Sequence, residues 1–445
     1  MRDGQQKRTA LVTGATGYVG GNVVKQLLDD GWRVRILCRS SAKARKRSWG
    51  DEVEIVGGDA TERSDVARAL KGADCAWYLL HSMDSGSGFA DAEAEMARQF
   101  GEVAAEQGVG RIVYLGGLHP TDSSGVSEHL ASRVKVGEML MGSGVPTAAL
   151  QAGVVIGSGS LSFQLLRHIT ERAPTFIAPD WIRNEITPIS ERDIVHYLVK
   201  AADLPADVNR SFDVGGPETM PYVDMMERYA QAVGLHRRPY FTAPIMTRRM
   251  ASAGLSFLTS LSDDEILPIF ESVSVDTVVK ERDLEELVGT PAGGNQSFAE
   301  AVRVAARDTA PGAYGEVATT FHVIAALWSL WAPGRAWWLP LNLTQAVTMV
   351  PTVADINERD DSQALEATLG FGPFSAPASQ TAFATALNLD FNWIARRWPN
   401  KWTRGAWLLS SLDLARRVYK EKPLRVLGLV PYIAAQFLMV RPTRR

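Results

Sequence analysis

Hydrophobic residues follow two different periods along the first 150 positions of this chain. Short apolar runs, beginning with residues 10–12, precede stretches in which apolar residues recur every three or four positions. The first such stretch covers residues 19–28 and ends at Gly31, a residue type suited to the position that follows a helix. The pattern therefore predicts strands that alternate with helices, as in an α/β fold with a doubly wound parallel (Rossmann) sheet.

Five further apolar runs predict the other strands of this sheet. They cover residues 33–39, 53–56, 75–80, 111–115 and 146–151, and the longer predicted helices between them cover 89–108 and 132–142. After residue 153 the pattern predicts helices at 160–172, 191–202 and 222–233, short strands at 186–189 and 211–214, and an irregular loop at 174–181. We interpret residues 7–310 as one nucleotide-binding domain whose small substrate lobe comes mainly from 156–185 and 220–310.

The composition changes beyond residue 310. Eight of the twelve tryptophans lie after residue 320, and residues 393–445 carry a net charge of +10 against −13 for the rest of the chain. The apolar runs 321–332 and 426–440 are shorter than the roughly 20 residues that span a bilayer. We expect 311–445 to form a mostly helical domain, with these runs either in its core or lying on an anionic membrane surface.

The remaining composition sets the class of protein. Hydrophobic residues make up 46% and charged residues 22% of the chain, as in a soluble globular protein. Cys38 and Cys75 fall in or beside predicted strands, so we expect buried thiols rather than a disulfide. We expect no secretory signal and a cytoplasmic location, with association to the cytoplasmic membrane surface as an alternative. We also expect neither a metal site nor a nucleic-acid partner. The oligomeric state is not indicated.

A glycine-rich turn follows the first predicted strand and opens the first predicted helix. Its residues are Gly14, Ala15, Thr16, Gly17, Tyr18, Val19 and Gly20. Glycines at 14 and 17 let backbone N–H groups approach a pyrophosphate, and Gly20 lets the helix lie close to the strand. The unpaired N–H groups and partial positive charge of the helix N-terminus favour a bound phosphate. The turn therefore predicts a dinucleotide site.

The end of the second predicted strand indicates which nucleotide is bound. An NAD-preferring site usually has an acidic residue here, whereas this strand ends in Arg39 and Ser40. A guanidinium pairs with a phosphate and stacks on adenine, so we expect NADP(H) rather than NAD(H). Lys43, Arg45, Lys46 and Arg47 follow closely and either add to this site or are solvated helix charges.

Other predicted cofactor contacts lie at the carboxyl ends of neighbouring strands. Asp59, with Ala60 beside it, is expected to accept a hydrogen bond from the adenine amino group, to cap the next helix, or to do both. The loops that contain Leu80, His81 and Gly116 are expected at the same edge of the sheet.

These motifs resemble those of a known family. Residues 13–20, Arg39, Gly58-Asp59 and 114–118 are similar to those of atypical short-chain dehydrogenases/reductases, and more closely to the NmrA-like, NAD(P)H-binding group. The segments 81–83, 127–130, 155–160 and 215–218 are also similar to bacterial proteins of this group. The resemblance covers about residues 8–310 and is specific for the nucleotide fold.

The resemblance implies a catalytic set that this chain lacks. Typical members carry Ser or Thr after the fifth strand and a Tyr-x-x-x-Lys pair on the next helix, where this chain has Gly116, Gly117, His129 and Arg133. Arg133 is expected to hold the ribose hydroxyls, and His129 to serve as proton donor or to be a surface residue. His81 and His119 lie on the same loop edge and are weaker candidates.

Two functions follow from this resemblance. The first is an NADP(H)-dependent oxidoreductase with an unusual proton donor, which reduces an apolar carbonyl or quinone-like substrate. The second is a non-catalytic NADP(H) sensor or scaffold of the NmrA type. Epimerase or dehydratase chemistry is a third, weaker alternative.

Overall fold

The computed structural model describes residues 7–80, 89–119, 128–172, 176–235, 240–242, 269–270, 273–307 and 408–409. The chain divides into two compact units, the first formed by Met1–Gln164, Asp180–Val233 and Leu267–Arg307. The second unit is formed by Leu165–Pro179, Gly234–Ile266 and Asp308–Arg445. The predicted C-terminal helices at 321–332 and 426–440 lie outside the described residues.

The first unit contains a seven-stranded parallel sheet, as the sequence predicts. Its strands are β1 (Thr9–Thr13), β2 (Arg33–Cys38), β3 (Glu54–Gly57), β4 (Cys75–Tyr78), β5 (Arg111–Gly117), β6 (Thr147–Ala152) and β11 (Arg210–Val214). Their order is β11-β6-β5-β4-β1-β2-β3, and every neighbouring pair is parallel. The direction of winding therefore reverses between β1 and β4, the place where ligands bind in such sheets.

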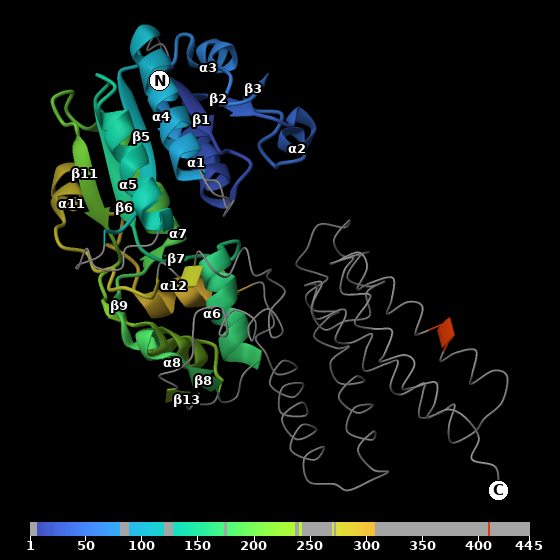
Figure 1. Cartoon of the computed structure of the whole chain (residues 1–445), viewed down its shortest axis with the longest axis vertical. Helices are drawn as coiled ribbons and strands as arrows, with labels where there is room; N and C mark the ends of the chain where they lie inside the picture. Colours follow the sequence, from blue (N-terminus) through green and yellow to red (C-terminus); the bar gives the residue numbers. More distant parts are fainter. Residues whose placement is uncertain are drawn as a thin grey trace, which may run out of the picture. The chain divides into compact units, whose positions relative to one another are not determined.

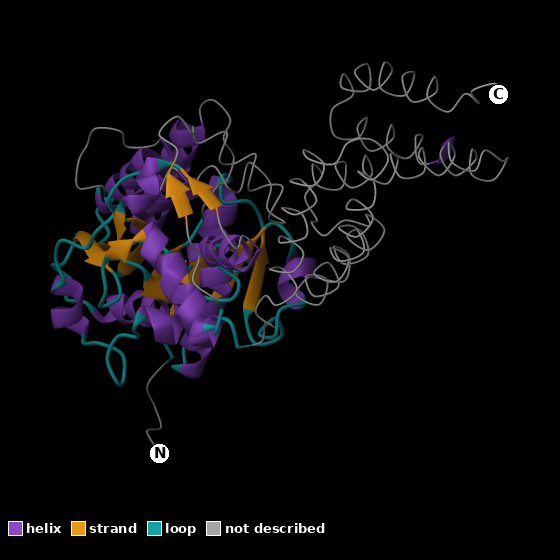
Figure 2. Ribbon diagram, turned by 90° about the horizontal axis from the view of Figure 1, so that it is seen from below, coloured by secondary structure: helices purple, strands orange, loops and turns teal. Residues whose placement is uncertain are grey.

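Helices cover both faces of the sheet (Figures 1 and 2). They are α1 (Tyr18–Asp29), α2 (Ser41–Arg45), α3 (Arg63–Leu70), α4 (Phe89–Glu106), α5 (Glu128–Met141) and α7 (Glu191–Lys200). On one face, Val23 of α1 and Leu198 of α7 pack in one buried cluster with Val12 of β1. On the other face, Phe100 of α4 and Val136 of α5 pack with Ile112 and other buried residues. The two cores thus pack the sheet between its two layers of helices.

Smaller elements complete the described part of the chain. They are β7 (Val155–Ile156), α6 (Leu161–Arg172), β8 (Phe176–Ala178), η1 (Asp180–Arg183), β9 (Glu185–Ile186), β10 (Ile189–Ser190), η2 (Ala201–Asp203), β12 (Met220–Pro221), α8 (Tyr222–Ala232), β13 (Tyr240–Thr242), α11 (Asp283–Val288) and α12 (Phe298–Ala305). No helix among these residues is both long enough and apolar enough to cross a bilayer.

Two predictions of local structure were wrong. The expected strand at 186–189 is two strands, because Ile186 pairs with Met220 while Ile189 pairs with Val155. Pro188 lies between them and has no N–H for a continuous ladder. The segment 174–181, expected to be irregular, contains β8, which pairs with β13 about 60 residues further along the chain.

Candidate functional site

The glycine turn closes tightly between β1 and α1. Gly14 has a φ of +67°, and a Cβ atom there would lie 2.1 Å from the carbonyl oxygen of Leu79. A Cβ atom on Gly20 would lie 2.3 Å from the carbonyl oxygen of Gly14. The N–H of Gly17 donates to that same oxygen at 2.9 Å. Glycine is therefore required at positions 14 and 20 by the close approach of three backbone segments.

The N-terminus of α1 is available to an anion. Gly17 is the N-cap residue with extended backbone angles, no side chain caps the helix, and its first turn contains no acidic residue. The first N–H groups of the 12-residue helix, from Tyr18 onwards, therefore have no intrahelical acceptor. Such groups and the helix dipole bind phosphate, as the sequence predicts for this turn.

The side chain of Tyr18 points away from this role. Its hydroxyl donates a hydrogen bond to the Glu191 carboxylate at the start of α7. Cβ atoms on Gly157 or Gly159 would collide with the Tyr18 ring or hydroxyl, so the ring packs directly on that loop. Burial, together with the Glu191 carboxylate, raises the pKa of the Tyr18 hydroxyl. The predicted cofactor contact of Tyr18 is thus restricted to its backbone.

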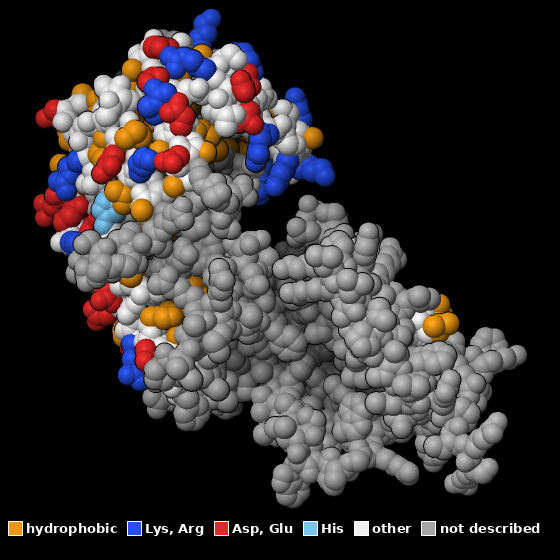
Figure 3. Space-filling view, viewed as in Figure 1, with side chains coloured by type: hydrophobic (Ala, Val, Ile, Leu, Met, Phe, Trp, Pro, Cys, Tyr) orange, Lys and Arg blue, Asp and Glu red, His pale blue; other side chains and the backbone are white. Residues whose placement is uncertain are grey.

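Basic side chains gather at the carboxyl end of β2 (Figure 3). Arg39 is exposed and forms no hydrogen bond or ion pair with any residue that the structure describes. The Ser40 hydroxyl caps α2 by accepting from the N–H of Lys43 at 3.3 Å. Arg47 donates to the carbonyl oxygen of Thr16 in the glycine turn. Sequence reasoning grouped Arg47 with the other nearby charges, because nothing in the local pattern shows this contact.

Asp59 has a local partner. One of its carboxylate oxygens, Oδ1, accepts from the N–H and the hydroxyl of Thr61, both at 3.0 Å. Asp59 therefore closes a turn before α3. The prediction that it caps this helix was wrong, because the N-cap is Glu62. The other oxygen, Oδ2, has no partner among the described residues, so the predicted bond to an adenine amino group stays a prediction. Ala60 beside it is half-buried.

The side chain of Arg133, a residue of α5, lies near the carboxyl end of β5. Its Nη1 would be 3.7 Å from a Cβ atom on Gly117, and Leu130 would be 3.0 Å from the same atom. The Tyr114 hydroxyl donates to the Arg133 carbonyl oxygen at 3.2 Å and ties α5 to the strand. Arg133 is half-buried and pairs with no carboxylate in the described part of the chain. A positive charge thus occupies the edge where Gly116 and Gly117 provide no hydroxyl.

The histidines that the sequence suggests as proton donors are only partly described. His81 and the side chain of His129 lie outside the described residues. Leu80, which precedes His81, is half-buried after β4. His119 follows β5, and its Nε2 lies 3.0 Å from Nε2 of Gln151 in β6. Burial lowers the pKa of His119, and Asp213 opposes that shift. His119 is therefore held by Gln151, and its burial favours the neutral imidazole.

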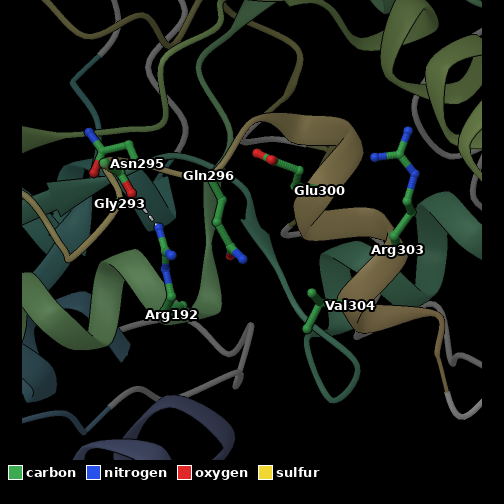
Figure 4. A pocket seen from close by; sticks show the side chains of 8 residues that line it. Arg192, Gly293, Asn295, Gln296, Glu300, Arg303 and Val304 are labelled. Carbon is green, nitrogen blue, oxygen red and sulfur yellow. Dashed lines mark hydrogen bonds between the residues drawn. The ribbon is translucent and has the colours of Figure 1, made fainter.

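A cavity of about 280 Å³ lies at the starts of α7 and α12 (Figure 4). None of the predicted site residues lines it. Arg192 binds Asp193 and the Gly294 carbonyl, and Glu300 accepts from Ser297 in a capping box. The charged groups of Arg192 and Glu300 are thus used in local contacts, and we assign the cavity no ligand.

Comparison with known proteins identifies relatives of this chain. Residues 6–238 match the model of the NmrA-like family. The chain is 29% identical over 167 residues to a ceramide reductase from Caulobacter vibrioides, covering 37% of this chain and 51% of that protein. It is 25% identical over 304 residues to an NAD(P)H azoreductase from Xenophilus azovorans, covering 65% and 96%. A sanguinarine reductase from Eschscholzia californica is 24% identical, covering 48% and 91%.

Solved structures share the fold. The chain superposes on a Citrobacter sp. triphenylmethane reductase with a TM-score of 0.53 and 16% identity, covering 67% of this chain and 99% of that one. The epimerase Mth375 from Methanothermobacter thermautotrophicus gives a TM-score of 0.53 and 15% identity, covering 68% and 92%. These similarities confirm the Rossmann-like fold predicted from the sequence.

Proposed function

Because the chain belongs to the NmrA-like family, we propose that it is an NADP(H)-dependent oxidoreductase of the atypical short-chain dehydrogenase/reductase type. Its proposed substrate is an apolar carbonyl or quinone-like compound. The observation that carries the proposal is the open, uncapped N-terminus of α1 behind the closed Gly14 turn. Arg39, which has no partner among the described residues, follows the neighbouring strand β2. Relatives named as reductases support reduction as the reaction class.

The residues at this edge fit a pyridine dinucleotide. The bare amides of α1 would hold the pyrophosphate, Arg39 the 2′-phosphate, and Arg133 the hydroxyls of the nicotinamide ribose. When bound, the reduced nucleotide supplies a hydride. The chain must then supply a proton to the substrate oxygen. His81 and His129 are the donors that the sequence suggests, and His119 is a weaker candidate because burial favours its unprotonated form.

A second function deserves the same test, because the usual hydroxyl donors are missing. Gly116, Gly117, His129 and Arg133 replace the serine, tyrosine and lysine of typical family members. A protein that senses NADP(H) without chemistry needs only the turn and Arg39. Nucleotide binding without turnover would favour this alternative.

The experiment combines calorimetry with a spectroscopic assay on the full chain. NADPH and NADH are titrated separately, and the oxidation of each is then followed in the presence of a panel of quinones, aldehydes and ketones. We expect tighter binding of NADPH and its oxidation by at least one apolar member of the panel. Binding with no oxidation would reject the oxidoreductase, and no binding of either nucleotide would reject both functions.

A further inference from the structure

Arg47 connects the segment after α2 to the glycine turn. It lies two residues beyond the last residue of α2, is exposed, and donates to the carbonyl oxygen of Thr16. The two residues are 31 positions apart in the chain. A guanidinium has five N–H donors, so one bond to a carbonyl leaves most of its donors available to an anion.

The backbone around Arg47 is held against α1. Trp49 is 2% exposed and belongs to the same buried cluster as Val23 and Val24 of α1. A Cβ atom on Gly21 of that helix would lie 3.9 Å from the indole nitrogen of Trp49. The N–H of Gly50 donates to the Arg47 carbonyl at 2.8 Å and closes a compact turn. Arg47 therefore starts from a fixed backbone position, which lowers the entropy cost of holding a ligand.

Arg39 and Arg47 approach the turn from different segments. Arg39 follows β2, the strand that pairs with β1, whereas Arg47 follows α2 and bonds to Thr16. Neither side chain has a carboxylate partner among the residues that the structure describes. Figure 3 shows the gathering of Lys and Arg side chains over α2 in this part of the first unit. Two unneutralised guanidiniums beside one turn favour a ligand with a phosphate in addition to its pyrophosphate.

We propose that Arg47 is a second residue that determines specificity for the 2′-phosphate of NADP(H) and acts together with Arg39. This inference rests on the proposed function for the identity of the nucleotide. The bond to the Thr16 carbonyl holds the Arg47 guanidinium at the turn, where it would bind the 2′-phosphate of a nucleotide. Preference for NADP(H) then comes from a pair of arginines rather than from the residue after β2 alone.

The test compares Arg47→Ala with Arg45→Ala, a matched exposed arginine that forms no bond to the turn. Affinities for NADP⁺, NAD⁺ and the fragment 2′,5′-ADP are measured by calorimetry on the full chain, with thermal unfolding to verify folding. We expect Arg47→Ala to weaken the binding of NADP⁺ and of 2′,5′-ADP about tenfold or more, because a charged hydrogen bond is lost. The affinity of Arg47→Ala for NAD⁺ should change less than about threefold. Arg45→Ala should keep its affinities for all three ligands within about threefold of those of the unaltered chain.

Other results overturn the inference in distinguishable ways. Equal losses for NADP⁺ and NAD⁺ would show that Arg47 only shapes the turn, and no loss would show that it does not reach the phosphate. The predicted split without turnover of any substrate would reject the oxidoreductase and leave the role of Arg47 intact. Failure of the unaltered chain to bind any of the three ligands would reject the inference and the proposed function together.

Discussion

The hydroxyl of Tyr18 donates a hydrogen bond to the carboxylate of Glu191, although 173 positions separate the two residues. Tyr18 begins α1 at the glycine turn, and Glu191 begins α7. The Tyr18 ring also packs on Gly157 and Gly159, which precede α6. One side chain thus links the nucleotide turn to the loop after β7, on the predicted substrate side of the unit.

A double-mutant cycle measures the Tyr18–Glu191 bond. Tyr18→Phe and Glu191→Ala should each lower the free energy of unfolding by about 1 kcal/mol, because each leaves a half-buried polar group without its partner. The double variant should lose less than the sum of the two. Urea denaturation of all four proteins provides the values. Strict additivity would show that the two side chains do not interact in solution.

Gly14 and Gly17 have different requirements although both belong to the turn. Gly14→Ala should cost on the order of 3 kcal/mol or more, because the residue has positive φ and its new Cβ would overlap the Leu79 carbonyl. Gly17→Ala meets only the Gly14 oxygen at 3.1 Å and should fold. Its methyl group would occupy the space that the pyrophosphate needs and weaken the binding of NADP(H) about tenfold or more. Thermal unfolding and calorimetry separate the two effects, and full nucleotide affinity in Gly17→Ala would contradict the assignment.

Arg39→Ala tests the preference for NADP(H). We expect a loss of about tenfold to a hundredfold in NADP(H) affinity, since a charged hydrogen bond contributes about 1.5–3 kcal/mol. NAD(H) affinity should change little, because it lacks the phosphate that the guanidinium binds. Parallel calorimetric titrations give the ratio. Equal losses for both nucleotides would remove the phosphate assignment.

His119 should make stability depend on pH. Burial is the largest effect and lowers the pKa of His119 in the folded state, and the positive charge of Lys280 adds to this shift. The negative charges of Asp213 and Glu138 act in the opposite direction. The pKa of His119 in the unfolded chain is about 6.5, so below this pH the unfolded chain binds a proton at His119 more readily than the native chain does. The stabilisation is therefore present above pH 6.5 and is lost as the pH falls through the folded pKa.

The variant His119→Gln keeps a partner for Gln151 and removes this titration. Between pH 7.5 and 5 it should lose less unfolding free energy than the unaltered chain, as measured by chemical denaturation. The imidazole NMR signal that is missing from the spectrum of this variant is that of His119. In the unaltered chain this signal should titrate below pH 6.5. A pKa at or above 6.5 would refute the described burial.

The basic segment 393–445 is the basis of a membrane proposal. The intact chain should bind vesicles that contain anionic lipid, and deletion of this segment should abolish the binding, since each surface cation contributes about 1 kcal/mol. High salt should partly reproduce the deletion by screening. Sedimentation with vesicles measures both effects. An intact chain that leaves such vesicles unbound would end this proposal.

Local spacing alone accounts for the strand, turn and helix of the nucleotide site. Glycines at 14, 17 and 20 fall between an apolar run and a helical repeat, and this short-range chemistry was enough to predict β1, α1 and the bare helix N-terminus. Gly31 likewise ends α1 with a φ of +84°, as its position after the repeat predicts. Both cysteines are free thiols, and Cys75 is buried as predicted, whereas Cys38 is only half-buried.

The partners of the site's side chains depend on how the chain is folded in space. Arg47 reaches Thr16, His119 reaches Gln151, and Tyr18 reaches Glu191 across gaps that carry no periodic signal. Strand pairing between distant segments made a strand of Phe176–Ala178, where local residues predict a loop. Periodicity reports which face of an element is buried, whereas these contacts follow from the packing of whole elements, which no short stretch of residues encodes.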